Sequence, residues 1–167
     1  MTRMRPTFKI IFAVIALSAL SWADTQGNCT QIDNSSRPDC PSAIAFFGRM
    51  QTALKNHDRQ TLVSLIHYPL LTTLNHKKAR IRNRRDLLSH YDDIFDAGVR
   101  CAILNSASKD VWGNWRGFTI DGGDVWFDAI IPPGDRPDIK APDYWTRYSF
   151  AIITINNGYG EEHCKKR

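Results

Sequence analysis

The order of two hydrophobic periods along the chain constrains its fold more than any other feature. Apolar side chains recur every three to four residues over residues 41–66 and again over residues 83–98, which is the repeat of an amphipathic α-helix. The last third is rich in β-branched and aromatic residues, and Gly122 and Gly123 interrupt them as a turn would. Helices followed mainly by strands predict an α+β fold with a largely antiparallel sheet.

Three helices are expected in the first hundred residues. The first spans residues 41–56, and Asp58 can cap a second, shorter one that Pro69 ends. Asn83 can cap a third helix, which Gly98 stops. The apolar face of the second helix is expected to contain Leu62, Leu65 and Ile66. Residues 99–104 fit either a helical turn or a strand, because a short apolar run has no diagnostic period.

The strands begin with a hairpin. Apolar residues 70–74 and alternating residues 78–82 predict two strands joined at Asn75 and His76. Two further strands flank the glycine pair. A proline-rich loop over residues 132–142 leads to a final long strand over residues 144–155.

The N-terminus has the pattern of a secretory signal peptide. Arg3, Arg5 and Lys9 precede an apolar run from Ile10 to Leu20. This run of 11 residues is too short to cross a bilayer core of about 30 Å. Small residues precede a cut after Ala23, so we expect residues 1–23 to be removed and the protein to be periplasmic or secreted. No later segment is expected to span a membrane.

The charge balance argues against a nucleic-acid partner. The chain of 167 residues has 22 Lys and Arg against 17 Asp and Glu, a net charge of +5. Three of the positive charges lie in the expected signal peptide, which leaves 19 against 17, a net charge of +2. So small an excess gives no reason to expect nucleic-acid binding. The remaining 144 residues are enough for one ordinary domain.

Four cysteines follow the signal peptide, and an even number in an exported protein predicts disulfides. Three pairings are possible, and proximity favours Cys29 with Cys40 and Cys101 with Cys164. The first bridge would lie within a polar extended arm over residues 24–40, and residues 41–164 would form the single domain. No CxxC or HxxxH spacing occurs, so neither a metal nor a cofactor is expected.

The order of elements resembles the NTF2-like superfamily, and its small exported bacterial members in particular. The resemblance covers residues 42–155 and includes Leu65-Ile66-His67-Tyr68-Pro69-Leu70 and Gly123-Asp124-Val125-Trp126-Phe127. It implies a strongly curved sheet that wraps around the helices into a cone with a cavity. Ketosteroid isomerases, dehydratases and polyketide cyclases use that cavity, and many members have no catalytic activity, so the fold does not choose a function.

One interpretation is a cavity enzyme of the ketosteroid-isomerase or dehydratase type acting on a small apolar substrate. Such a site needs a carboxylate base and buried acid or phenol donors. Asp128 would be the base, with Tyr148 and Tyr91 as donors, and Asp92 is an alternative to Tyr91 on the same helix. His67 is a further candidate base, because imidazole titrates near neutral pH. The competing interpretation places Asp128 at a strand end and both tyrosines among core aromatics, and we favour it.

The densest charge cluster predicts a binding surface instead. Six positive charges fall within nine residues, and acidic residues such as Asp92, Asp93 and Asp96 lie elsewhere. The cluster consists of Lys77, Lys78, Arg80, Arg82, Arg84 and Arg85. Trp112, Trp115 and Trp145 would strengthen an interface if exposed, because Trp and Arg dominate binding energies. Such a run is more often simply the solvated face of a hairpin. As a binding surface it could dock an acidic partner, a lipid headgroup or a cell-wall polymer.

The sequence therefore favours an exported, non-catalytic binding protein over the cavity enzyme. Its partner would be an envelope or secreted protein, as for a periplasmic accessory, inhibitor or immunity protein. No nucleophile motif, metal set or cofactor loop is recognisable, whereas arginines and tryptophans suited to binding are abundant. The oligomeric state is left open, with a homodimer among the options.

Overall fold

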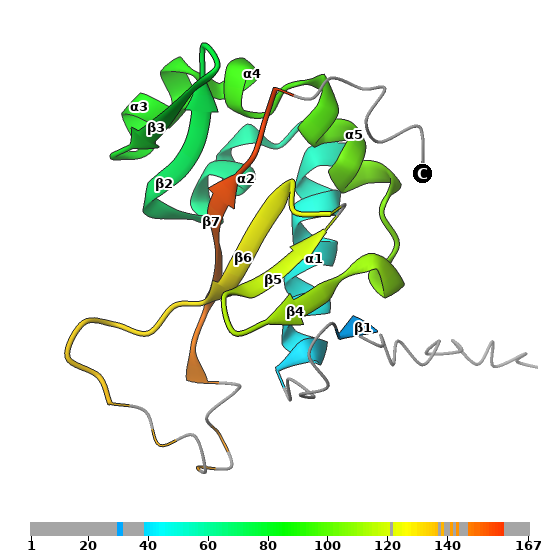
Figure 1. Cartoon of the computed structure of the whole chain (residues 1–167), viewed down its shortest axis with the longest axis vertical. Helices are drawn as coiled ribbons and strands as arrows, with labels where there is room; N and C mark the ends of the chain where they lie inside the picture. Colours follow the sequence, from blue (N-terminus) through cyan, green and yellow to red (C-terminus); the bar gives the residue numbers. More distant parts are fainter. Residues whose placement is uncertain are drawn as a thin grey trace, which may run out of the picture.

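The described part of this computed structural model contains one sheet and a set of mostly short helices (Figure 1). It comprises residues 30–31, 39–120, 122–136, 138, 141, 143 and 147–158. The expected signal peptide and Trp145 lie outside these residues. The helices are α1 (Cys40–Lys55), α2 (Arg59–Ser64), α3 (Arg84–Ser89), α4 (Tyr91–Ile94), α5 (Ala97–Asn105) and the 3-10 turn η1 (Ser108–Asp110). The strands are β1 (Thr30–Gln31), β2 (Ile66–Leu74), β3 (Lys77–Ile81), β4 (Trp112–Asn114), β5 (Gly117–Ile120), β6 (Val125–Ala129) and β7 (Phe150–Ile155).

These strands form one curved, open sheet in the order β1-β4-β5-β6-β7-β2-β3. Four of the six neighbouring pairs are antiparallel, and the β1–β4 and β2–β7 pairs are parallel. The α+β class and the mostly antiparallel sheet are therefore confirmed. Because β2 joins the sheet beside β7, the first hairpin lies against the last strand, and β3 ends the sheet.

Phenylalanine side chains fill the space between α1 and the sheet. The ring centroid of Phe46 on α1 lies 5.3 Å from that of Phe127 on β6 and 6.0 Å from that of Phe150 on β7. Phe118 on β5 lies 5.9 to 6.0 Å from the same two strand residues. All four side chains are buried. This cluster defines the inner face of the sheet, and residues that alternate with it along each strand lie on the outer face.

The hairpin expected at Asn75 and His76 is confirmed. Both residues have a positive φ, 50° and 60°, as a two-residue type I′ turn requires. Strand β2 is longer than expected, because it begins at Ile66 and contains Pro69. Ile66 therefore belongs to β2, and the prediction that it lies on the second helix is wrong.

The single third helix expected over residues 83–98 is also wrong, because the chain forms α3, α4 and α5 instead. Asn83 does cap α3, through a 3.0 Å bond from the Asp86 amide. A second cap signal at Asp96 restarts the helix, since its carboxylate accepts a 2.8 Å bond from the Val99 amide. Gly98 therefore lies inside α5, which also includes residues 99–104.

The structure describes a short piece of the polar arm and corrects the expected start of the last strand. The polar arm contains strand β1, whose residues Thr30 and Gln31 pair with Trp112 and Gly113 of β4. The last strand begins at Phe150, later than expected, and residues 147–149 precede it. Short strands paired with distant partners leave little periodic signal in a sequence.

Neither of the two described cysteines, Cys40 and Cys101, is a free thiol, and each is disulfide-bonded. The partners expected for them, Cys29 and Cys164, lie outside the described residues. The pairing of Cys29 with Cys40 and of Cys101 with Cys164 therefore stays a prediction.

Alanine substitutions at Gly117 and Gly48 should change the free energy of unfolding in opposite directions, and this tests the fold. Gly117 begins β5 with φ at 123°, and a Cβ there would lie 2.9 Å from the Phe127 carbonyl oxygen. We expect Gly117→Ala to lower the free energy of unfolding by about 1 to 3 kcal/mol. Gly48 lies within α1, and a Cβ added there would meet no neighbouring atom within 4 Å, so Gly48→Ala should raise it by about 0.5 to 1 kcal/mol. Urea denaturation measures both, and equal effects would contradict this packing.

Candidate functional site

The six cations singled out in the sequence gather at the β3 end of the sheet. Lys77, Lys78 and Arg80 lie on β3, Arg82 follows it, and Arg84 and Arg85 open α3. All six are exposed. Within the described residues none of them forms an ion pair, and Arg84 donates a hydrogen bond to the Gln60 side chain. These six residues are called the basic surface below.

The alternation of β3 decides where its cations point. Ile81 is buried and pairs with buried Leu70, so these two residues face inward. Arg80 and Lys78 alternate with inward residues and therefore lie on the outer face. Arg80 is opposite Leu71, which is 43% exposed. The outer face thus presents two cations beside an exposed apolar side chain.

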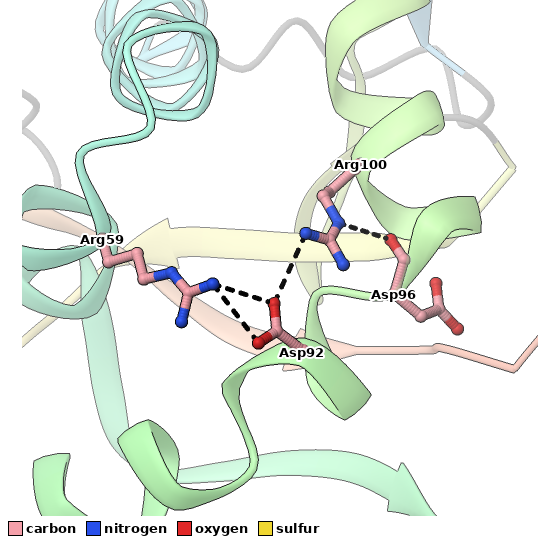
Figure 2. Close-up of polar contacts among 4 residues, drawn as sticks. All are labelled: Arg59, Asp92, Asp96 and Arg100. Atoms are coloured by element: carbon pink, nitrogen blue, oxygen red, sulfur yellow. Dashed lines mark hydrogen bonds and ion pairs between the residues drawn. The ribbon is translucent and has the colours of Figure 1, made fainter.

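Asp92 on α4 is one of the acidic residues singled out in the sequence, and it pairs with arginines that are not part of the basic surface. Arg59 Nη2 lies 3.2 Å from Asp92 Oδ1 and 3.3 Å from Oδ2. Arg100 Nη1 approaches the same Oδ1 at 3.5 Å (Figure 2). Arg59 also lies over the ring of Tyr91, 4.5 Å from its centroid. The network joins α2, α4 and α5, and it gives Asp92 two cations that are not part of the basic surface.

Asp93 and Asp96 are also engaged elsewhere. Asp93 Oδ2 lies 3.5 Å from His90 Nδ1. Asp96 caps α5, and its second oxygen accepts a 2.8 Å bond from the Gly158 amide. Among the described residues, none of these three aspartates forms an ion pair with a cation of the basic surface.

Trp112 and Trp115 lie far from the basic surface. Trp112 on β4 is half-buried against Trp126 of β6, with ring centroids 5.5 Å apart. Trp115, in the β4–β5 turn, is 79% exposed, and the Arg116 guanidinium lies 4.7 Å from its centroid. Five strand-to-strand steps separate β4 from β3, or roughly 24 Å. One surface patch therefore does not combine Trp112 or Trp115 with the cations.

Asp128, the base of the enzyme interpretation, lies on the outer face of the sheet. Its neighbour Phe127 packs inward on Phe46, so the alternation of β6 directs Asp128 away from α1. Asp128 Oδ1 accepts a 2.9 Å bond from the Ala129 amide. The carboxylate is therefore on the side of the sheet opposite the helix-covered interior.

The two tyrosines of the same interpretation lie near opposite ends of β7. Tyr148 precedes β7, and its hydroxyl donates a 2.8 Å bond to Asp135 Oδ2. Tyr91 is buried on α4, and the Asp93 carbonyl of the same helix accepts a bond from Asn157, which follows β7. Phe150–Ile155 alone spans about 16 Å. Burial raises the pKa of Tyr91, which keeps its phenol protonated at neutral pH. The structure does not bring the three residues to one site.

The remaining candidates lack chemical partners. His67 is exposed on β2. No group of three His, Cys, Asp or Glu residues in the described ranges is placed to hold a metal ion. A surface hollow runs along α5, and it is lined by Ala97, Arg100, Cys101, Leu104 and Asn105. These five side chains include no carboxylate or imidazole, and Cys101 is not a free thiol.

Asn157 connects β2 to α4, and no sequence pattern predicts this role. Asn157 accepts bonds from Thr72 Oγ1 at 3.0 Å and from the Thr73 amide at 2.9 Å, and it donates to the Asp93 carbonyl at 2.7 Å. It thereby ties β2 to α4. The Asn156-Asn157-Gly158 sequence signals a turn, but no local pattern shows which distant groups it bonds.

Comparison of the chain with protein-family models, with curated proteins and with solved structures finds no match. None of the helices in the described ranges is long and apolar enough to span a bilayer.

Asp96 and Asp92 should contribute unequally to the free energy of unfolding. Asp96→Ala removes a helix cap and the bond from Gly158, and we expect it to lower the free energy of unfolding by about 1 to 2 kcal/mol. Asp92 is 60% exposed, so Asp92→Ala should cost less than about 1 kcal/mol, and added salt should shrink that cost further. Urea denaturation at two salt concentrations measures both. A larger loss for Asp92→Ala would contradict the assignment of Asp96 as the main tie.

Proposed function

We propose that this protein is exported and acts without catalysis, by binding an acidic envelope or secreted protein through the basic surface. A periplasmic accessory, inhibitor or immunity protein would act in this way. The observation that carries the proposal is the concentration of six exposed cations without an ion pair among the described residues. An acidic partner would supply the missing counter-charges.

The charge distribution supports binding to a protein. The chain without its expected signal peptide has a net charge of only +2, so its field is weak away from the basic surface. Close to that surface, clustered Lys and Arg attract an acidic patch and raise its association rate. A local positive field in a nearly neutral protein favours a partner with a matching local patch over a long polyanion.

The fold included in this proposal is the NTF2-like arrangement. Its support is the order of a long helix, a short helix, a hairpin, further helices and then further strands. The curved sheet packed on α1 is consistent with a cone. The interior of the described part is packed with Phe46, Phe118, Phe127 and Phe150, and this filling favours binding at the surface over chemistry in a cavity.

Charge reversal on β3 tests the proposal. The double variant Lys78→Glu, Arg80→Glu should capture its partner from an envelope extract at least about tenfold more weakly than the unchanged protein, because two attractive contacts become repulsive. Capture is measured by quantitative mass spectrometry of pull-downs at matched bait levels. Thermal unfolding of the variant checks that its fold is intact.

A matched control changes the same charge elsewhere. Lys55 at the end of α1 and Arg116 in the β4–β5 turn are exposed and distant from β3 in the chain. The double variant Lys55→Glu, Arg116→Glu should retain capture within about twofold. Equal losses in the two variants would attribute the effect to net charge and reject the basic surface as the binding site.

A further inference from the structure

Strand β3 presents a free edge as well as a positive charge. Among the strands that the structure describes, it is the last of the sheet and pairs with β2 alone. Apart from the β2 ladder, none of the main-chain hydrogen bonds between described residues involves residues 77–81. An edge strand of this kind offers a row of N–H and C=O groups to which another strand can pair.

The hairpin turn determines which residues offer those groups. A two-residue type I′ turn closes on a hydrogen-bonded pair, here Leu74 with Lys77. Bonded and non-bonded pairs alternate along an antiparallel ladder. Ala79 and Ile81 therefore bond to β2, whereas the main-chain groups of Lys78 and Arg80 point toward the free edge.

The same two residues carry the cations of the outer face. Ala79, which lies between them, faces inward and is only partly buried. Any strand added antiparallel to β3 would place residues directly opposite Lys78 and Arg80 on the outer face. The residue between those two would lie on the inner face beside Ala79.

We propose that β3 binds an extended acidic segment of a protein partner as an additional antiparallel strand. Acidic residues of that segment pair with Lys78 and Arg80 through both main-chain bonds and side-chain charges, and an apolar residue between them lies beside Ala79. The recognised sequence therefore alternates acidic and apolar residues. This inference rests on the proposed function, since it specifies how the acidic partner is bound.

The charges also disfavour the simplest competing occupant, a second copy of the chain. An antiparallel pair of β3 strands would set lysines and arginines against one another, and like charges directly opposite are unfavourable. Cations on an edge strand thus discourage self-association. For an acidic strand the same side chains are attractive, so they discriminate between the two occupants.

Synthetic peptides test the inference with the full exported protein. The probe is an N-acetylated, C-amidated heptapeptide that alternates aspartate and valine, and its control has the same composition with the four aspartates in one block. Isothermal titration calorimetry should show the alternating peptide binding at least about tenfold more tightly. Arg80→Glu should abolish this preference, and Lys55→Glu should preserve it.

Methylation of the peptide main chain separates strand pairing from charge attraction. Methyl groups on the amide nitrogens of the two central aspartates remove bonds to Lys78 and Arg80, and we expect affinity to fall about tenfold or more. Methyl groups on two valine amides, which point away from β3 in the antiparallel register, should change affinity by less than about threefold. Amide exchange of Lys78 and Arg80 should slow on binding, whereas that of Ala79 should stay unchanged.

Three results would overturn the inference. The alternating peptide could bind no more tightly than the blocked peptide or the aspartate-methylated peptide. Either result would show that charge alone attracts the ligand, and the proposed function would stand without strand addition. A loss on valine methylation instead would reject the antiparallel register. Absence of binding by the alternating peptide would reject strand addition, while the pull-down with charge-reversed protein would still decide the proposed function.

Discussion

Packing of Phe46 on Phe127 determines the orientation of the rest of the structure. This contact presses α1 on one face of the sheet, and side chains that alternate with Phe127 must then lie on the other face. Asp128 faces outward for this reason. Through the pairing of β6 with β7, of β7 with β2 and of β2 with β3, the same division reaches Arg80 on the last described strand. The core therefore sets which charges a partner can meet.

Two aspartates, Asp92 and Asp96, hold the short helices in place. Asp92 holds Arg59 and Arg100, and Asp96 links the start of α5 to Gly158. The Asp92 contacts connect α4 to α2 and α5, which are short helices that would be unstable alone. The Asp96 bond connects the start of α5 to the segment after β7. Among the described residues, neither carboxylate pairs with a cation on β3 or α3.

The sequence predicted features that depend on nearby residues. The first helix, the cap at Asn83 and the turn at Asn75 and His76 follow from local rules, and so does the exposure of the basic cluster. The separation of Trp115 from that cluster could not be predicted, because it depends on strand order across the whole sheet. The helical period over residues 83–98 continues through Asp96 and hides the break there, although aspartate is itself a cap signal.

The candidate site also depends on contacts between residues that are distant in the chain, so it could be predicted only in part. Asp128, Tyr148 and Tyr91 are separated in sequence, and nothing local shows that the strand alternation and β7 keep them apart. The pairing of Asp92 with Arg59 likewise joins helices through tertiary packing. The six cations were accessible to prediction because they are neighbours in the chain.

The left-handed turn at Asn75 and His76 has a thermodynamic consequence for recognition. It locks β2 and β3 in one register, so the positions of Lys78 and Arg80 are fixed before any ligand arrives. Such a preorganised receptor loses little conformational entropy on association, and the ordering cost falls almost entirely on the incoming chain. A disordered ligand would consequently bind with an affinity governed by its own stiffness, so residues that favour extended backbone would strengthen binding without adding a contact.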